Sequence, residues 1–331
     1  MDFELDDDEA ALAEGVRRLC AGRFPLDTLR AAEGRPDVID RASWKELADA
    51  GVLSLRAPEP DGLGLGMAEA AVVFEELGRA LVPGPLVASH LAAAAGIVPG
   101  SGDGDAVVGV VRRPDGAGPE AVTGALVEHL GVLHTLLVVD DDGIWAVDPG
   151  SLDAERVERP LDPLTPLWRV PHLPAGERLV GDGRADATRW QRDETVLIGA
   201  MCVGIAFATL EMAVEYAKGR EQFGRPIGSF QAVKHLCADM LVRAETARAA
   251  VHAAAVTIDQ PDVGDAARAA AGAGLLASEA AKANGRSCIQ VHGGMGFTWD
   301  VPAHLYVMRS RVLAAGLRAP GDLAELVAGS L

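Results

Sequence analysis

The chain has 331 residues, of which 49% are hydrophobic, enough apolar material for one large domain or for two to three smaller domains that share interfaces. Its 30 basic and 48 acidic residues give a net charge of −18 without a basic stripe, which excludes a polyanionic nucleic acid as a partner. The four cysteines form no CxxC pair, so we expect buried thiols rather than a disulfide framework or a zinc site.

The start of the chain, MDFELDDDEA, is acidic and has neither the basic nor the apolar segment of a signal peptide. No uninterrupted apolar run approaches the ~20 residues that span a bilayer. We therefore expect a soluble, cytoplasmic protein that does not enter a membrane.

Residues 1–100 are predicted to form a helical domain. Apolar residues recur at helical spacing between Asp6 and Cys20. Ser43 is expected to cap a second helix, SWKELADAGVL, and a third is expected over MAEAAVVFEELGRAL. After a break, His90–Val98 continues as an alanine-rich helix.

Residues 101–185 change character, because Gly, Pro and Asp become more frequent. Turn residues separate short β-type runs, which predicts an antiparallel barrel or sandwich. The acidic run Asp140–Asp142 is interpreted as a solvent-exposed turn, and Trp145 is assigned to packing. The expected strands are AVVGVV, LHTLLVVD, GIWAVD and PLWRVPHL.

Residues 186–331 are predicted to be helical again. Asp186–Lys218, Phe230–Asp259 and Asp262–Gln290 are each long enough for ~45 Å of helix. Their alanine-rich faces favour close antiparallel packing as a four-helix bundle, and helices of this length favour oligomerisation. The fold class is therefore α+β, mainly α, with domains over 1–100, 101–185 and 186–331.

The stretch YAKGREQFGRPIGSFQAVKH, which begins at Tyr216, joins the first two of these long helices. Its glycines and prolines indicate a compact loop, and Ser229 is expected to cap the helix that follows. Arg220 would then lie beside the positive end of that helix, an arrangement that suits a pyrophosphate. The alternative is an ordinary corner between two helices with an exposed arginine.

Two motifs resemble known sequence patterns of one family. REQFGRPIGSFQAVKH resembles the signature of acyl-CoA dehydrogenases, and QVHGGMGFTWDVPAHLYVMRSR, from Gln290, resembles that family's C-terminal glycine motif. PEPDGLGLG is similar to a loop of the family's N-terminal domain. The resemblance implies a helical N-terminal domain, a middle β-domain that is shortened here, and a C-terminal four-helix bundle.

The resemblance also implies a flavin adenine dinucleotide (FAD) site shared across a subunit boundary. In the family, one chain's β-domain holds the flavin ring and the neighbouring chain's bundle holds the ADP end. Arg220 and Gln222 match the residues that contact the neighbour's pyrophosphate and adenosine, and Phe223 matches one near the adenine. The remaining matches are Gln231 at the start of the next helix and the glycine-motif residues Gln290, Gly293, Gly294 and Gly296.

The half-site that a subunit keeps for its own flavin is not recognisable. The family's TEP-type segment with its following Gly-Ser-Asp, and its WIT-type strand, hold the flavin ring. Neither occurs in residues 101–185. A complete FAD site within one chain is therefore not expected.

The family's catalytic base is a glutamate that removes the α-proton of an acyl-CoA while a β-hydride passes to the flavin. Its usual C-terminal position corresponds here to SRVLAAGLRAPGDL, which has no glutamate before Glu325. A minority of members place the base twenty-six residues before the loop arginine, which is Glu194 here. Glu194 is followed by Thr195 where an arginine is common, and its alternative role is that of a solvated acid in a first helical turn.

The leading hypothesis is a subunit of a heteromeric acyl-CoA dehydrogenase, such as a heterotetramer with a full-length partner, that desaturates an acyl-CoA. The family includes such pairs for bulky steroid thioesters, and electrons would leave through an electron-transfer flavoprotein. The alternatives are a homodimer or homotetramer that uses Glu194, a non-catalytic stabilising subunit, and a flavin-independent enzyme such as a dehydratase. His129 and His134 have no carboxylate or cysteine at metal-ligand spacing, so no metal is expected, and His292 is interpreted as a backbone-supporting or adenosine-side residue rather than a general base.

Overall fold

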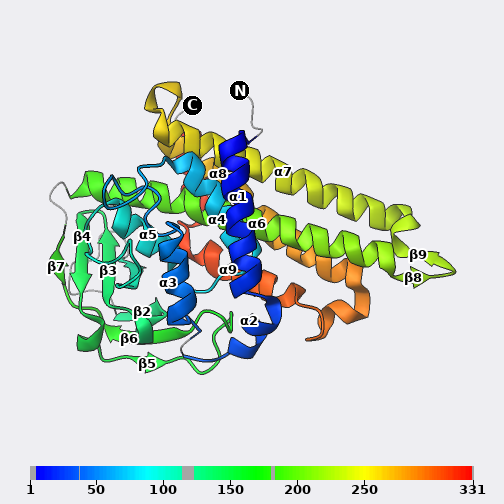
Figure 1. Cartoon of the computed structure of the whole chain (residues 1–331), viewed down its shortest axis with the longest axis horizontal. Helices are drawn as coiled ribbons and strands as arrows, with labels where there is room; N and C mark the ends of the chain where they lie inside the picture. The colour runs from blue at the N-terminus through cyan, green and yellow to red at the C-terminus, as the bar shows by residue number, and fades with distance from the viewer. Residues whose placement is uncertain (1–4, 37, 114–122, 180–182, 330–331) are drawn as a thin grey trace. The chain divides into compact units, whose positions relative to one another are not determined.

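The computed structural model of the protein describes residues 5–36, 38–113, 123–179 and 183–329. The predicted fold class is confirmed: N-terminal helices, a small middle β region and a C-terminal helical bundle (Figure 1). The first four residues of the acidic start lie outside the described residues. The chain divides into two compact units, which are described in turn.

The first unit comprises residues 1–26, 67–82 and 195–331. Three long helices and a two-stranded ribbon organise it, and the ribbon joins α6 to α7 at their far end in Figure 1. The predicted long helices are confirmed with small shifts at their ends. Its elements are α1 (Asp7–Arg23), α4 (Met67–Arg79), α6 (Arg184–Gly219, from Thr195 onward), β8 (Glu221–Gln222), β9 (Arg225–Pro226), α7 (Gln231–Asp259), α8 (Ala266–His292), α9 (Ala303–Gly316) and α10 (Pro320–Ala328).

Helix α6 is the core helix of this unit. Among the described residues, it alone is long and apolar enough to cross a membrane, which the sequence pattern did not predict, but 89% of its most apolar window is buried inside the protein. Glycine lets α4 approach it closely: a Cβ on Gly204 would lie 1.9 Å from the carbonyl oxygen of Glu75, and one on Gly78 would lie 2.2 Å from that of Met201. Only glycine at both positions permits this contact.

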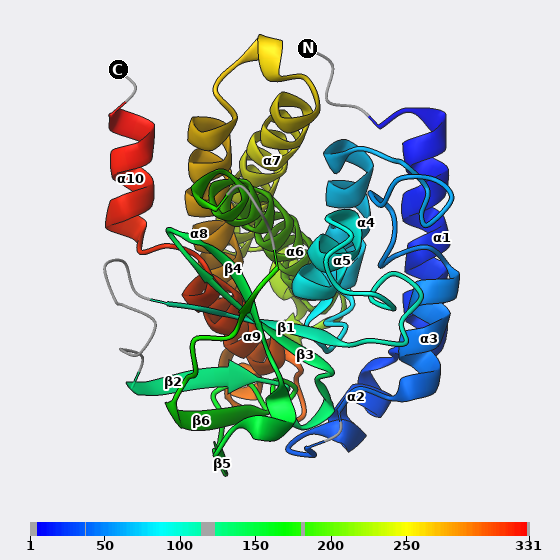
Figure 2. The same cartoon turned by 90° about the vertical axis from the view of Figure 1, so that its left-hand side faces the viewer.

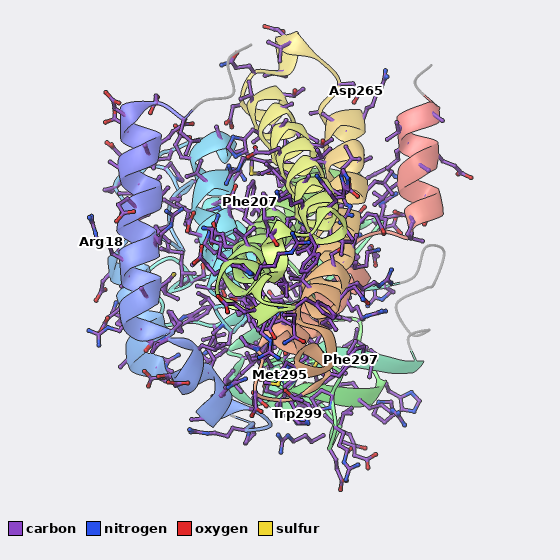
Figure 3. The ribbon with its side chains drawn as sticks, turned by 90° about the vertical axis from the view of Figure 1, so that its right-hand side faces the viewer. Arg18, Phe207, Asp265, Met295, Phe297 and Trp299 are labelled. Atoms are coloured by element: carbon purple, nitrogen blue, oxygen red, sulfur yellow. The ribbon has the colours of Figure 1, made fainter. Side chains whose placement is uncertain are left out.

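Helix α4 also buries two carboxylates, and both are paired. Glu76 accepts hydrogen bonds from Arg17 at 2.7 and 2.9 Å, and Glu75 forms a bidentate pair with Arg248. The ring of Phe207, labelled in Figure 3, lies 3.8 Å from the Arg248 guanidinium. Because a buried charge is tolerated only when it is paired, these contacts fix α1, α4 and α7 in one arrangement.

The second unit comprises residues 27–66 and 83–194. It holds the middle β region and three short helices (Figure 2). Its helices are α2 (Leu26–Ala32), α3 (Arg41–Asp49) and α5 (Leu86–Ala94), and its strands are β1 (Val108–Arg112), β2 (Thr123–Glu128), β3 (Thr135–Asp140), β4 (Gly143–Val147), β5 (Glu155–Arg156), β6 (Leu167–His172) and β7 (Glu177–Arg178).

The strands form two sheets, ordered β1-β3-β4-β7 and β2-β6-β5. A hydrophobic cluster that includes Val127, Leu136 and Val170 is drawn from both, with Trp145 packed against it as predicted. The expectation of a purely antiparallel arrangement is wrong, because β1 pairs with β3 in parallel. The reason is that β2, which lies between them in the chain, joins the other sheet, so no hairpin links β1 to β3.

Two smaller predictions are also wrong. Ser43 does not cap α3; Asp40 does, accepting from the backbone N–H of Ser43 at 3.0 Å, because the helix begins three residues earlier than predicted. Asp140 is not a solvated turn residue. It is buried at the end of β3 and accepts from Arg113 at 2.7 Å, since a carboxylate at that depth requires a charged donor.

Candidate functional site

The loop between α6 and α7 folds into a tight hairpin. Glu221 lies opposite Pro226 and Gln222 lies opposite Arg225. The two turn residues, Phe223 and Gly224, both have positive φ angles, +54° and +74°, as in a type I′ turn. Phenylalanine is strained in this conformation, and its side chain is 91% exposed. Strain on an exposed aromatic residue is typical of a functional position.

The register of the ribbon sorts its side chains onto two faces. Residues directly opposite each other in an antiparallel pair share a face, so Gln222 and Arg225 lie on one side and Glu221 and Pro226 on the other. The carbonyl of Arg220 accepts from the N–H of Ile227 at 2.7 Å, which extends the ladder by one pair. Arg220, two residues before Gln222, therefore belongs to the face of Gln222.

The ring of Phe230 contacts the side chains of Arg225 and Phe223. The guanidinium of Arg225 stacks over the Phe230 ring, 4.1 Å from its centroid, and Phe223 meets the same ring edge-on at 6.1 Å. Gln222 donates to the carbonyl of Glu221 at 2.7 Å. Within the described part of the chain, neither Arg220 nor Arg225 forms an ion pair, although the protein carries a net charge of −18.

The start of α7 also differs from the prediction. The residue at the N-cap is Phe230, and no side chain accepts from the first turn. Ser229 belongs to a short 3₁₀ turn (Ile227–Ser229) and is therefore one residue too early to cap the helix. Gln231 is the first helical residue and is exposed. The backbone N–H groups of this turn remain available to an anion.

The glycine motif begins where α8 ends. Gly293 has φ +59° and ψ −135°, a conformation that a residue with a Cβ avoids. A Cβ on Gly296 would lie 2.5 Å from the carbonyl oxygen of Ile289, so this glycine packs the turn against α8. Gly294 is exposed, and a Cβ there would face open space. It leaves bare backbone at the surface, as close approach of a ligand requires, and Gln290 is exposed nearby in sequence.

A stacked pair of rings joins the two motifs. Tyr216, one turn before Arg220, stacks on His292 with ring centroids 4.2 Å apart, and Nδ1 of His292 lies 2.8 Å from the carbonyl oxygen of Cys288. The predicted nucleotide residues at the end of α6, the start of α7 and the end of α8 are therefore brought to the same end of the bundle. His292 has the supporting role that the sequence predicted.

These residues fit the ADP portion of a dinucleotide. Two unpaired guanidiniums and an uncapped helix start can neutralise a diphosphate, and exposed aromatic and glycine positions can lie against an adenine. The described residues include no cluster of His, Cys, Asp or Glu that could hold a metal ion. The arrangement therefore suits binding of an anionic nucleotide.

Glu194 lies in the second unit, ten residues into α6. It is 4% exposed and accepts a hydrogen bond from Arg112 at the end of β1. Its neighbour Asp193 accepts from Arg56 at 3.0 Å. The interpretation as a solvated first-turn acid is wrong, because the helix begins at Arg184 and the carboxylate is buried and paired.

Sequence reasoning missed three residues of the nucleotide end: Tyr216, Arg225 and Phe230. The signal for Arg225 was present, because alternation along a hairpin places it with Gln222, but two-residue strands are too short to recognise from a pattern. The stack of Tyr216 on His292 joins residues far apart in sequence and leaves no local signal.

Large apolar side chains are exposed around the same end of the first unit. Phe297 and Trp299 are 82% and 67% exposed, and Figure 3 shows them with Met295 in the turn after α8. A groove of about 650 Å³ runs between α6 and α7 and is lined partly by Leu210, Val214 and Leu241. Exposed apolar side chains of this size are candidates for burial against another protein surface.

Fold and site together define a helical-bundle protein that presents an anion site at the end of its longest helices. A family model described as the C-terminal domain of acyl-CoA dehydrogenase matches residues 181–316, and one described as the N-terminal domain matches residues 6–102. Acyl-CoA dehydrogenase IpdE2 of Mycobacterium tuberculosis is 35% identical over 322 residues, covering 94% of this chain and 93% of that relative. The chain belongs to the acyl-CoA dehydrogenase family.

Two further comparisons bear on assembly. Acyl-CoA dehydrogenase FadE34 of Mycobacterium tuberculosis is 35% identical over 302 residues, which cover 87% of this chain but only 42% of that relative. The chain therefore spans less than half of its length. A crystal structure of the ChsE4–ChsE5 complex from Mycobacterium tuberculosis superposes with a TM-score of 0.84 at 25% identity, covering 100% of this chain and 98% of that one.

Proposed function

We propose that this chain is one subunit of an acyl-CoA dehydrogenase that desaturates an acyl-CoA thioester together with a longer partner chain. The observation that carries the proposal is an asymmetry between two groups of residues. The residues that match the family's nucleotide half-site lie together and carry unpaired positive charge, whereas the candidate base Glu194 is buried in an ion pair with Arg112.

In this proposal, the chain supplies the ADP-binding half of an FAD site that the partner completes. Arg220 binds the pyrophosphate, Gln222, Phe223 and Gln231 contact the adenosine end, and Gly293–Gly296 offers backbone to the AMP portion. Bound FAD supplies the hydride acceptor. The partner supplies the pocket of the flavin ring and the base that removes the α-proton, and an electron-transfer flavoprotein takes up the electrons.

The comparisons support a divided site without deciding it. A structural neighbour is a complex of two proteins, ChsE4 and ChsE5, and more than half of the relative FadE34 lies outside the region that matches this chain. The exposed Phe297 and Trp299 and the groove between α6 and α7 give a partner apolar surface to bury. A bulky acyl group, such as a steroid side chain, is the substrate class that the family resemblance suggests.

The test is to purify the chain alone and together with the subunit that co-purifies with it, and to measure flavin absorbance and acyl-CoA desaturation. We expect no stoichiometric flavin in the isolated chain and a flavin-loaded, active pair. In the pair, Arg220→Ala is expected to lower FAD occupancy. Stoichiometric flavin and turnover in the isolated chain would refute the divided site, and full occupancy in Arg220→Ala would indicate a stabilising subunit that does not touch the cofactor.

A second candidate function is a self-sufficient homo-oligomer in which Glu194 is the base. One observation favours it: the Glu194 side chain is buried, which would shield a base from water, and substrate binding would then displace Arg112 from it. Glu194→Gln would then abolish turnover while the flavin content stayed unchanged.

A further inference from the structure

The binding face of the β8–β9 ribbon carries two guanidiniums. Arg220 and Arg225 lie on the same face with Gln222 between them in sequence, and Glu221, the ribbon's only acidic residue, lies on the opposite face. The described residues provide no ion-pair partner for either arginine. A face with two positive charges and no carboxylate matches a ligand with two adjacent negative charges.

We infer that Arg225 is a second diphosphate-binding residue beside Arg220, and that stacking on Phe230 holds it in position. This inference rests on the proposed function, because it takes the ligand of the ribbon to be the diphosphate of FAD. It adds a residue that the sequence motif did not assign and gives Phe230 a positioning role.

The geometry of the stack explains why Arg225 is suited to this role. The central carbon of the guanidinium lies over the Phe230 ring, 4.1 Å from its centroid, so the ring contacts the cation without using its N–H donors. Because the stack holds the Arg225 side chain in place before the ligand binds, less conformational entropy is lost on binding. The uncapped N–H groups of α7 begin at the residue after Phe230, so backbone donors lie next to the stacked cation.

The experiment uses the protein as it assembles, with its co-purifying subunit or as the homo-oligomer if none co-purifies. FAD is removed, and reloading is followed by the change in flavin fluorescence. ADP and adenosine are then titrated as competitors at low and high salt. The variants are Arg225→Met, Phe230→Leu and Arg220→Met. The matched control is Arg268→Met, an exposed arginine in the first turn of α8.

Arg225→Met is expected to weaken FAD and ADP about tenfold, with adenosine unchanged and a smaller dependence on salt, because one charge-assisted contact to phosphate is lost. Phe230→Leu is expected to weaken ADP less, since Arg225 remains but is no longer held. Arg268→Met should match the unmodified protein.

Three results would overturn the inference, and they are distinguishable. If Arg220→Met weakens ADP and Arg225→Met does not, Arg225 has no phosphate contact while the proposed function stands. If neither arginine variant changes ADP binding, the ribbon is not a nucleotide site and the proposed function fails with the inference. An equal loss for adenosine and ADP in Arg225→Met would indicate a collapsed hairpin, and it would also refute a phosphate-specific role.

Discussion

Tyr216 stacks on His292 with ring centroids 4.2 Å apart, and this contact joins the end of α6 to the end of α8. The hairpin with Arg220 follows Tyr216 by one helical turn, and the glycine motif begins at the residue after His292. Two segments that are about seventy residues apart in sequence thereby face one ligand site. The stack links the two segments directly, so it is a point at which to test the proposed shared nucleotide site.

We expect Tyr216→Leu to lower FAD occupancy and to reduce the free energy of unfolding by about 1 kcal/mol, the usual value of an aromatic pair. Flavin absorbance relative to protein and the thermal midpoint measure the two effects. The matched control is Tyr216→Phe, which keeps the ring and should retain both. Unchanged occupancy in Tyr216→Leu would show that the two motifs keep their places without the stack.

The ion pair between Arg112 and Glu194 predicts a stability effect rather than a catalytic one. Glu194→Gln and Arg112→Gln are each expected to lower the free energy of unfolding by about 1–3 kcal/mol, because each leaves a largely buried charge without its counter-charge. The double variant is expected to lose less than the sum of the two, which urea denaturation of all four proteins measures.

Measuring the turnover of the assembled protein distinguishes a stabilising role of Glu194 from a catalytic one. Under the divided site, Glu194→Gln should retain desaturation within a factor of a few. A loss of several orders of magnitude at normal flavin content would identify Glu194 as the base, and the homo-oligomer would then be the better description.

Much of the fold follows from local patterns. The long helices α6, α7 and α8 follow from long alanine-rich runs that contain no proline, and tertiary context only trims their ends. The parallel pairing of β1 with β3 was not predictable, because it depends on where β2 goes. Likewise, the sequence pattern predicts that Asp140 is a turn residue, and only the structure shows that Arg113 donates a hydrogen bond to it.

The same limit applies to the site. Arg220 and Gln222 could be identified from the motif, but the stacking of Arg225 on Phe230 depends on a hairpin register that two-residue strands do not encode visibly. The pairing of Glu194 with Arg112 joins positions far apart in sequence, and a sequence motif contains no information on it.

His90 predicts a pH dependence of stability in the second unit. Its ring is fully buried, and burial together with the nearby charge of Arg56 lowers its pKa from 6.5 to about 3. Between those two values the unfolded chain binds a proton at His90 and the folded protein does not, so stability is present above pH 6.5 and is lost as the pH falls.

The expected contribution of His90 is a loss of about 1.4 kcal/mol per pH unit below its unfolded pKa. The glutamine of His90→Gln can still donate to the carbonyl of Val52. We expect the urea midpoint of this variant to depend less on pH than that of the unmodified protein between roughly pH 6 and pH 4. The control is His235→Gln, an exposed histidine on α7. Parallel pH curves for His90→Gln and the unmodified protein would contradict the assignment.

The side chain of Asn284 links the three long helices α6, α7 and α8. Its side chain is fully buried on α8, and its amide donates to the carbonyls of Ala206 on α6 and Met240 on α7, at 3.1 and 2.9 Å. Its oxygen accepts from Arg243 at 2.8 Å. Asn284→Leu is expected to cost about 2–4 kcal/mol, since two buried helix carbonyls lose their additional donors and the Arg243 guanidinium loses its acceptor.

Comparing Asn284→Leu with Arg243→Met separates the effect of the two hydrogen bonds to helix carbonyls from the effect of the contact with Arg243. That variant removes only the half-buried guanidinium and should cost about 1 kcal/mol or less. Because α6, α7 and α8 carry the hairpin and the glycine motif at their ends, Asn284→Leu should also lower FAD occupancy, and Arg243→Met should not. If Asn284→Leu unfolds at the same urea concentration as the unmodified protein, the amide does not set the spacing of these helices.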